Sequence, residues 1–361
     1  MSQLFTPLTV RDITFRNRLW VSPMCMYSAA DGVVNDWHHV HLAQFASGGA
    51  GLVVSEATAV VPEGRISPED AGIWTDQQAD AWRPVVQSIR DRGTVAGIQL
   101  AHAGRKASTF SPFASSHGSV PADRGGWVTE APSAIAYDGL AEPVAMTAER
   151  IAEVVAAFRA AARRALDAGF QVLEIHAAHG YLLHEFLSPL SNERDDEYGG
   201  SLENRARLTL DVVRAVRGEA GEGVPIFVRF SATDSAPGGL EVDDVAQVAA
   251  WAREAGADLF DISSSGLVAH QRIEVGPGYQ VPFAARVREA TGALTAAVGI
   301  ITSGAQAEEV LSDGSADVVF AGREWLRDPH FALRASSELG EDPHDIWPPQ
   351  YVRAYRALAR V

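Results

Sequence analysis

The sequence predicts an α/β fold built as a single (β/α)8 barrel, also called a TIM barrel. Strand-like and helix-like patterns alternate eight times, and the strand candidates are short, continuous apolar runs typical of strands covered on both faces. Polar residues cluster after nearly every run, and no Gly-x-Gly-x-x-Gly follows an early strand, which disfavours an open doubly wound sheet. The predicted strands are 19–23, 51–57, 95–101, 172–177, 225–231, 259–263, 294–299 and 317–322.

The helical patterns between these strands carry start and stop signals. Over 147–168 the apolar residues fall on one stripe at helical spacing, with Thr147 as the N-cap and Gly169 as the stop. A further helix is predicted to open at Thr75, because Gln78 follows it in capping-box spacing. Pro84 lies inside that pattern and predicts a kink or a split, since proline removes a helical hydrogen bond.

Three segments fall outside the alternation. Residues 1–18 predict a hairpin that closes the barrel floor, with its turn at Arg11 and Asp12. Residues 102–146 form a long connection after the third strand, and connections of that length are usually functional covers, so we expect an active-site cover here. The tail, 343–361, is aromatic and is expected to dock on the barrel or on a neighbouring subunit; it carries Trp347, Pro348, Pro349, Tyr351 and Tyr355.

Composition narrows the classes of protein. The 361 residues are 47% hydrophobic, ample for a large core, and we expect residues 1–361 to form one domain, since such barrels commonly run ~250 residues as one unit. The net charge of −16 argues against a nucleic-acid or anionic-membrane surface. One cysteine excludes an intrachain disulfide and a cysteine-rich metal site. The first residues do not resemble a signal peptide and no apolar run approaches ~20 residues, so we expect a cytoplasmic protein.

Cys25 and Tyr27 follow the first predicted strand. A lone cysteine is more often a small buried hydrophobe than a reactive group, and a lone tyrosine is more often part of the core. Two residues apart on an extended segment, however, both side chains point to the same face, which favours a joint place in the barrel mouth.

His176 and His179, followed by Tyr181, come after the fourth strand. Such a pair could bind a metal ion, but no nearby acidic residue completes a familiar ligand set, and a structural role is also open. The interpretation we favour is that both imidazoles donate hydrogen bonds to one developing oxyanion, with Tyr181 as the proton donor.

Two polar residues lie within apolar strands. Gln99 needs a hydrogen-bonding partner there, and a heterocycle with alternating donors and acceptors would supply one. Arg229 is the strongest single signal, because a buried cation costs several kcal/mol unless it is paired, and an anion or an electron-rich ring is the partner we expect.

The last two strands end in loops where barrels often hold phosphate. Gly299 and Gly322 would offer backbone N–H groups, and Arg323 adds a bidentate donor. Glycine alone is weak evidence, but glycines in both loops together with an arginine favour a phosphate site.

Four motifs resemble the Old Yellow Enzyme family of flavin-dependent ene-reductases, in particular its bacterial branch with Cys and Tyr after the first strand. The resemblance runs almost end to end. The motifs are Ile98-Gln99-Leu100-Ala101-His102-Ala103-Gly104-Arg105-Lys106, His176 to Tyr181, Ser188-Pro189-Leu190-Ser191-Asn192, and Asp196-Glu197-Tyr198-Gly199-Gly200-Ser201 with Glu203-Asn204-Arg205.

The resemblance implies a barrel that holds FMN without a covalent bond and uses NADPH or NADH as reductant. Arg229 would lie beside flavin N1, Gln99 at the pyrimidine edge, and Cys25 would tune the flavin potential by contact. Tyr27, His176 and His179 would bind the substrate, and Tyr181 would be the proton donor. The other residues implied to bind the cofactor are Ser22, Pro23, Met24, Ala57, Gly299, Gly322 and Arg323.

The implied reaction transfers a hydride from NAD(P)H through flavin N5 to the β carbon of an activated alkene, such as an enone, maleimide or nitroalkene. The α carbon is protonated by Tyr181. Two alternatives stay open: reduction of nitro-esters or nitroaromatics at the same site, and a metal-dependent hydrolase or lyase that uses His176 and His179.

One departure from the family pattern and one match to it concern the periphery. The stretch 108–130 is longer than in the shortest relatives and would reshape the substrate cover. Residues 350–353 match a Gln-Tyr-x-Arg tail that in relatives reaches a neighbouring active site, so we expect a homo-oligomer, a dimer or tetramer, with Arg353 as a candidate intersubunit contact.

Overall fold

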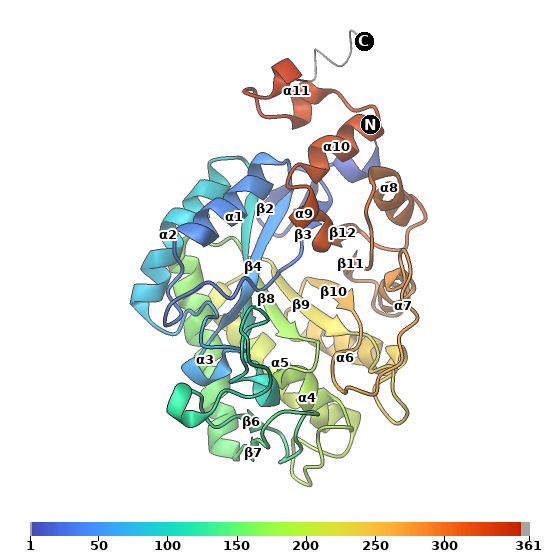
Figure 1. Ribbon diagram of the computed structural model, residues 1–361. Coiled ribbons are helices and arrows are strands. Elements are labelled where there is room, and N and C mark those ends of the chain that lie inside the picture. Colours follow the sequence, from blue (N-terminus) through green and yellow to red (C-terminus); the bar gives the residue numbers. More distant parts are fainter. Residues whose placement is uncertain (1, 355–361) are drawn as a thin grey trace.

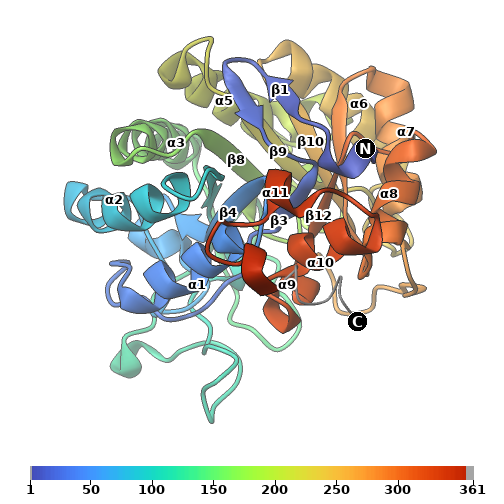
Figure 2. The same ribbon diagram turned by 90° about the horizontal axis from the view of Figure 1, so that it is seen from above.

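The computed structural model describes residues 2–354, and its centre is a closed ring of eight parallel strands in the order β3-β4-β5-β8-β9-β10-β11-β12 (Figures 1 and 2). β12 pairs with β3 and thereby closes the ring. The predicted (β/α)8 barrel is confirmed. The strands are β3 (Leu19–Val21), β4 (Leu52–Ala59), β5 (Val95–Ala101), β8 (Val172–Ala177), β9 (Ile226–Ser231), β10 (Leu259–Ser263), β11 (Leu294–Ala297) and β12 (Val318–Ala321).

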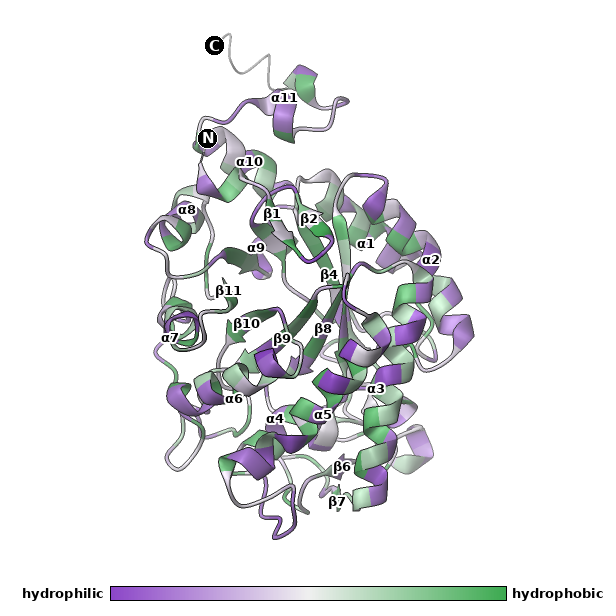
Figure 3. Ribbon diagram, turned by 180° about the vertical axis from the view of Figure 1, so that it is seen from behind, coloured by the Kyte–Doolittle hydropathy of each residue, from purple (hydrophilic) through white to green (hydrophobic). Residues whose placement is uncertain are grey.

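Helices surround this ring, as the view along it shows (Figure 2). Their apolar sides face the strands and their polar sides face outward (Figure 3). The α-helices of the described residues are α1 (Asp36–Ser47), α2 (Asp76–Arg90), α3 (Ala148–Ala168), α4 (Leu182–Leu187), α5 (Leu202–Ala220), α6 (Val242–Glu254), α7 (Val281–Thr291), α8 (Gly304–Ser312), α9 (Arg323–Arg327), α10 (Phe331–Glu338) and, in the tail away from the ring, α11 (Pro343–Ile346). Among the described residues no helix is long and apolar enough to cross a membrane.

The predicted helix signals operate as expected, with one correction. Thr147 caps α3 and Gly169 ends it in the left-handed conformation at φ 99°. Thr75 and Gln78 form the capping box of α2. The predicted split at Pro84 is wrong, because α2 continues from Asp76 to Arg90 with Pro84 inside it.

Strand ends differ from the predictions by one or two residues. β3 ends at Val21 before Pro23, which has no N–H to give to a ladder, and β11 ends before Gly299, whose φ is 124°. β4 runs on to Ala59, with a register shift between Ser55 and Ala57.

The N-terminal hairpin pairs β1 (Leu8–Val10) with β2 (Ile13–Phe15), as predicted. Phe15 packs on Trp20 with ring centroids 4.5 Å apart, and Trp20 stacks on Phe227 at 5.7 Å. These rings form one apolar cluster with the strand residues Leu52, Val54, Leu259 and Val318. The hairpin therefore seals one end of the barrel.

The cover and the tail lie on opposite sides of the barrel. The cover contains the short strands β6 (Glu130–Ala131) and β7 (Val144–Ala145), at the bottom of Figure 1, whereas α11 and the N-terminus lie at the top. In the tail, Trp347 and Pro348 line a cavity with Arg16, which follows β2, and the indole N–H of Trp347 donates to Ser336 Oγ of α10 at 3.2 Å. Tyr355 and the rest of the predicted tail to residue 361 lie outside the described residues.

Candidate active site

A cavity of about 460 Å³ lies at the carboxyl ends of the barrel strands. It brings together eight of the predicted site residues from five strand ends. β3 supplies the segment that follows it, β8 and β9 supply His179 and Arg229, and the loops after β11 and β12 supply the glycines and Arg323. The eight residues are Ser22, Pro23, Met24, His179, Arg229, Gly299, Gly322 and Arg323.

The residues of this cavity fit FMN. The Ser22 hydroxyl is buried and has no hydrogen-bonding partner within residues 2–354, so a polar ligand would satisfy it. Gly322 lines the cavity without a side chain, beside Met24 and Ser22. With Arg323 at the same wall, the cavity offers an anion site beside a slot lined by both polar and apolar groups, which matches a phosphate joined to a heterocyclic ring system.

Arg229 is paired more fully than the sequence suggests. Its Nε lies 3.1 Å from Asp261 Oδ2, and both side chains are buried. Glu174 is buried nearby and accepts a hydrogen bond of 2.7 Å from Gln99 Nε2. The anion expected beside Arg229 is therefore a carboxylate of the barrel itself, and Gln99 has a protein partner in Glu174 where we expected a heterocycle.

These groups form a charge cluster at the floor of the cavity. Burial raises the pKa of Glu174 and of Asp261, while the guanidinium of Arg229 lowers both. One guanidinium cannot balance two buried carboxylates, so the cluster retains a proton while its cation lines the cavity.

His176 and His179 lie together at the end of β8. Their rings meet edge to face with centroids 5.2 Å apart, and the Tyr181 ring lies 5.0 Å from His176. Burial, with the positive charge of Arg229, lowers the pKa of both imidazoles well below the usual value. Neutral imidazoles each keep one N–H to donate, which is the form that oxyanion binding needs.

Hydrogen bonds orient the two rings. Ala178 N–H donates to His176 Nδ1 at 3.3 Å, so the proton of the neutral ring is placed on Nε2. His179 Nε2 lies 2.7 Å from Ser263 Oγ, and the His179 backbone N–H donates to Ser231 Oγ. His179 itself has φ 59°, an uncommon conformation for a residue with a side chain.

Tyr181 adjoins the residues that follow β3. Cys25, Tyr27 and Tyr181 all pack against one small cluster of Ile66, Ala103 and Ala107. The predicted grouping is thus present, but its stated reason is wrong, because Tyr27 has φ 50° and does not lie on an extended segment. Ala57 and Tyr181 line a smaller neighbouring cavity of about 10 Å³.

The ionisation states in this cluster suit proton donation. Burial raises the pKa of Tyr181 well above its usual value, so it holds its proton at neutral pH. Burial, with the negative charges of Asp70 and Glu56, raises the pKa of Cys25 as well. Cys25 is therefore a neutral thiol rather than a thiolate nucleophile.

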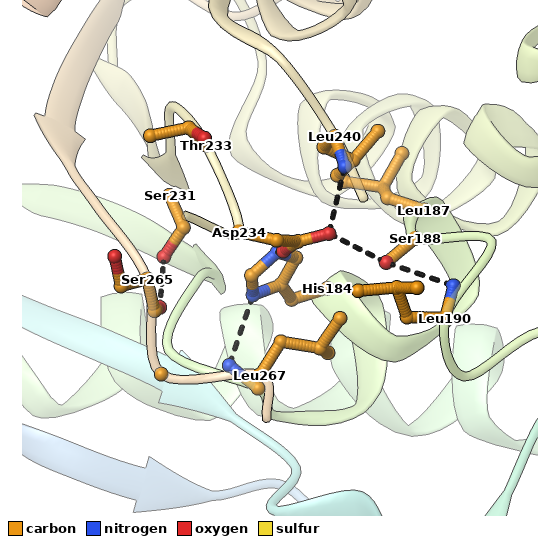
Figure 4. Close-up of polar contacts among 12 residues, drawn as sticks. His184, Leu187, Ser188, Leu190, Ser231, Thr233, Asp234, Leu240, Ser265 and Leu267 are labelled. Atoms are coloured by element: carbon orange, nitrogen blue, oxygen red, sulfur yellow. Dashed lines mark hydrogen bonds and ion pairs between the residues drawn. The ribbon is translucent and has the colours of Figure 1, made fainter. Parts of the chain in front are cut away.

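A buried network, which the sequence patterns did not indicate, holds the loop after β8 (Figure 4). His184 Nε2 lies 2.8 Å from Asp234 Oδ1, with both side chains fully buried, and Ser188 donates to the other carboxylate oxygen at 2.6 Å. His184 Nδ1 accepts the Gly180 N–H at 2.9 Å. Because Gly180 lies between His179 and Tyr181, this network fixes the peptide that joins them.

A second buried pair performs the same task after β3. His38 Nε2 lies 3.1 Å from Glu56 Oε1, and Glu56 Oε2 accepts the Met26 N–H at 2.9 Å. Met26 lies between Cys25 and Tyr27. The sequence did offer a signal for this pair, because Glu56 is a charged residue in the middle of the apolar strand β4. Asp261 within β10 is a comparable case.

Lys106 and Arg105, the cations that follow β5, donate hydrogen bonds to backbone carbonyl groups of neighbouring loops. Lys106 Nζ donates to His179 O and Gly266 O, each at 2.9 Å, and Arg105 donates to Leu267 O at 2.8 Å. They tie the loops after β5, β8 and β10 to one another. Within residues 2–354 no group of three or more His, Cys, Asp or Glu side chains is placed to hold a metal ion.

Comparison with known proteins gives consistent results. A model of the NADH:flavin oxidoreductase / NADH oxidase family matches residues 3–342. The chain is 48% identical to an NADPH dehydrogenase of Listeria welshimeri over 359 residues, covering 99% of this chain and 100% of the relative. It is also 48% identical to an NADPH dehydrogenase of Bacillus subtilis over 343 residues, covering 94% and 96%.

Solved structures resemble it over nearly the whole chain. Morphinone reductase superposes with a TM-score of 0.78 at 28% identity, covering 96% of this chain and 93% of that protein. An old yellow enzyme homologue from Zymomonas mobilis gives a TM-score of 0.77 at 26% identity, covering 96% and 98%.

Proposed function

Because this chain belongs to the NADH:flavin oxidoreductase / NADH oxidase family and is an FMN-dependent NAD(P)H oxidoreductase of the Old Yellow Enzyme type, we propose that it reduces activated alkenes. The observation that carries the proposal is the arrangement at the end of β8. Two neutral imidazoles, His176 and His179, and a neutral phenol, Tyr181, lie together beside the FMN cavity.

The cavity residues would hold the cofactor. Gly299, Gly322 and Arg323 would bind its phosphate, while Arg229, Gln99, Ser22, Pro23, Met24, Cys25 and Ala57 would line its ring. When bound, FMN supplies the redox chemistry, by which a hydride from NAD(P)H reaches the β carbon of the alkene through flavin N5.

The chain's own residues handle the substrate oxygen and the proton. His176 and His179 donate to the carbonyl or nitro oxygen, and these bonds strengthen as negative charge develops there. Tyr181 gives its O–H proton to the α carbon and recovers a proton from solvent, so each turnover consumes one NAD(P)H and one proton. Tyr27 lines the substrate side. Enones, maleimides and nitroalkenes fit this scheme, and nitro-esters and nitroaromatics are the second candidates because they offer the same oxygen.

The test separates the two half-reactions. In the His176→Ala/His179→Ala double variant, the reoxidation of reduced enzyme by cyclohex-2-enone should slow by at least 10²-fold, since loss of one oxyanion donor costs ~2.7–4 kcal/mol. Flavin reduction by NADPH should change far less. Stopped-flow absorbance of the bound flavin measures both rates.

Purified protein should be yellow and should release FMN on acid or heat treatment. A colourless preparation that FMN cannot reconstitute contradicts the cofactor assignment, and equal loss in both half-reactions contradicts the role of the two histidines. Val128→Ala, at an exposed position of the cover, serves as the control for the effect of a substitution as such.

The predicted homo-oligomer remains a proposal. Arg353 is exposed, and its neighbours Tyr351 and Trp347 line a cavity of about 580 Å³ with α10 on the outer surface. The sedimentation velocity of the purified holoenzyme reports its subunit number directly.

A further inference from the structure

Phe113 is the most exposed large hydrophobic residue of the cover, at 76%. Its only ring contact among the described residues is with Tyr27, edge to face, with centroids 6.0 Å apart and planes at 88°. A single exposed apolar side chain is ordinary on a protein surface. This one, however, lies against a tyrosine assigned to the substrate side of the active site.

The segment that carries Phe113 is anchored at its base. Thr109 and Ser119 form an antiparallel bridge, and Phe110 N–H donates to Gly118 O at 3.1 Å. Thr109 N–H and its hydroxyl both bond to Ile66 O, at 2.8 and 3.0 Å. The bridge therefore closes a hairpin-like loop on the body of the protein and leaves Phe113 near its tip.

Tyr27 connects this loop to the reacting groups. Tyr27 and Tyr181 pack against the same cluster of Ile66, Ala103 and Ala107, and Trp127 of the cover packs there too. The indole N–H of Trp127 donates a hydrogen bond of 2.9 Å to Glu63 O, which holds this side chain in place. Tyr27 therefore shares one apolar cluster with the proton donor and makes a ring contact with the loop tip.

We propose that Phe113 is a specificity-determining residue, which with Tyr27 receives an apolar, flat substituent that the substrate carries beyond its activated double bond. This inference rests on the proposed function. Two rings at a right angle form an apolar corner, and a third ring can fill it with its face on one and its edge on the other. Because Phe113 is largely exposed, it has apolar area still to bury when such a substituent arrives.

The consequence is a difference between substrates. Enones with a phenyl group at the β carbon should gain from Phe113, whereas a small cyclic enone should not reach it. Burial of one ring edge corresponds to about a tenfold gain in affinity. The gain should appear in KM, because Phe113 does not touch the reacting atoms.

The experiment compares the Phe113→Ala holoenzyme with the unsubstituted holoenzyme on 4-phenylbut-3-en-2-one and cyclohex-2-enone, with NADPH in excess. For the phenyl enone we expect KM to rise about tenfold at unchanged kcat, and for cyclohexenone both constants to stay within twofold. Phe113→Leu, which keeps apolar bulk without a ring, should fall between. Val128→Ala is the matched control, since Val128 is 68% exposed in the same cover and makes no ring contact.

Three results overturn the inference. KM values unchanged for both substrates would show that Phe113 lies outside the substrate's reach. Equal losses on both would assign it only a supporting role for Tyr27. A lower KM for the phenyl enone would make it a barrier to large substrates. If the unsubstituted enzyme reduces neither enone, the proposed function fails instead, and that outcome is separate from all three.

Discussion

Asp70 is a buried carboxyl close to the active site. Burial raises its pKa to about 7, with a further increase from the charge of Glu56 and a partial offset from hydrogen bonds donated by Ile66 N–H and the Ser67 hydroxyl. Tyr27, Cys25 and Tyr181 lie within range of its charge. The ionisation of this single residue therefore couples the stability of the fold to pH.

The raised pKa of Asp70 determines whether stability rises or falls with pH. Unfolded Asp70 titrates near 3.9, so between about pH 4 and pH 7 the folded state binds more protons than the unfolded state, and stability falls as pH rises through this interval. Between pH 5 and pH 8 the free energy of unfolding should drop by about 3 kcal/mol more in the unsubstituted protein than in Asp70→Asn. Urea titrations at the two pH values measure the difference, with the exposed Asp80→Asn as control. Parallel pH dependences in all three proteins would refute the burial argument.

Single residues also mark the limit of the sequence analysis. Arg229 lines the cavity, but its partner Asp261 was not foreseen. The pairing depends on the register of β9 against β10, which sets Arg229 beside Asp261. Register is a tertiary property that no local pattern contains, although an aspartate inside an apolar strand was as conspicuous as the arginine.

The loops after β8 and β10 approach each other closely through the backbone at two glycines. Gly180 has φ 73° and Gly266 has φ 96°. A Cβ on Gly180 would lie 2.3 Å from Gly266 O, and a Cβ on Gly266 would lie 2.7 Å from His179 Cα. These two glycines let the loops approach closely enough for Lys106 to bond to both.

Gly266→Ala should therefore displace His179 and slow alkene reduction by about 10- to 100-fold, because catalysis is sensitive to a misplacement of about 1 Å. Gly314→Ala is the matched control, since Gly314 has φ 71° but no atom within 4 Å of a built Cβ. Both variants place an alanine in the left-handed backbone conformation, so both should lose some stability. Only Gly266→Ala should lose activity per bound flavin. A similar loss in both would contradict the role of the close approach.

The elements themselves were predictable because their signals are local. Caps at Thr75 and Thr147 and the glycine after α3 fixed helix limits to within one residue. Pro84 misled because a proline inside a helix is tolerated when packing holds the helix, and Trp82, Val85 and Val86 beside it are fully buried. The conformation of the cover was not predictable, since its hydrogen bonds run to distant segments such as residues 63–66.

Over the whole molecule, the residues that stabilise the barrel and the residues of the active site lie mainly at opposite ends. Phe15, Trp20 and Phe227 fill the end of the barrel that the hairpin covers, and the site residues lie at the carboxyl ends of the strands. Phe15→Ala should lower the free energy of unfolding by about 3–5 kcal/mol by leaving a cavity. At temperatures where it remains folded, the variant should keep its kcat for enone reduction.

Urea unfolding and steady-state kinetics on the same preparation check both halves of this prediction. The exposed Phe113→Ala provides the comparison, with an expected stability change within about 0.5 kcal/mol. Loss of kcat in Phe15→Ala at low temperature would show that the two ends of the barrel are coupled.

The ladder between β3 and β12 also constrains synthesis on the ribosome. Leu19 pairs with Val319 and Trp20 with Phe320, so about 300 residues must be translated before the first barrel strand meets its last neighbour. At ~5–20 residues per second this takes roughly 15–60 s, during which one edge of that strand stays open to other chains. Nascent protein is therefore most in need of a chaperone before residues 318–321 emerge, and premature termination upstream of them yields a polypeptide whose sheet cannot close.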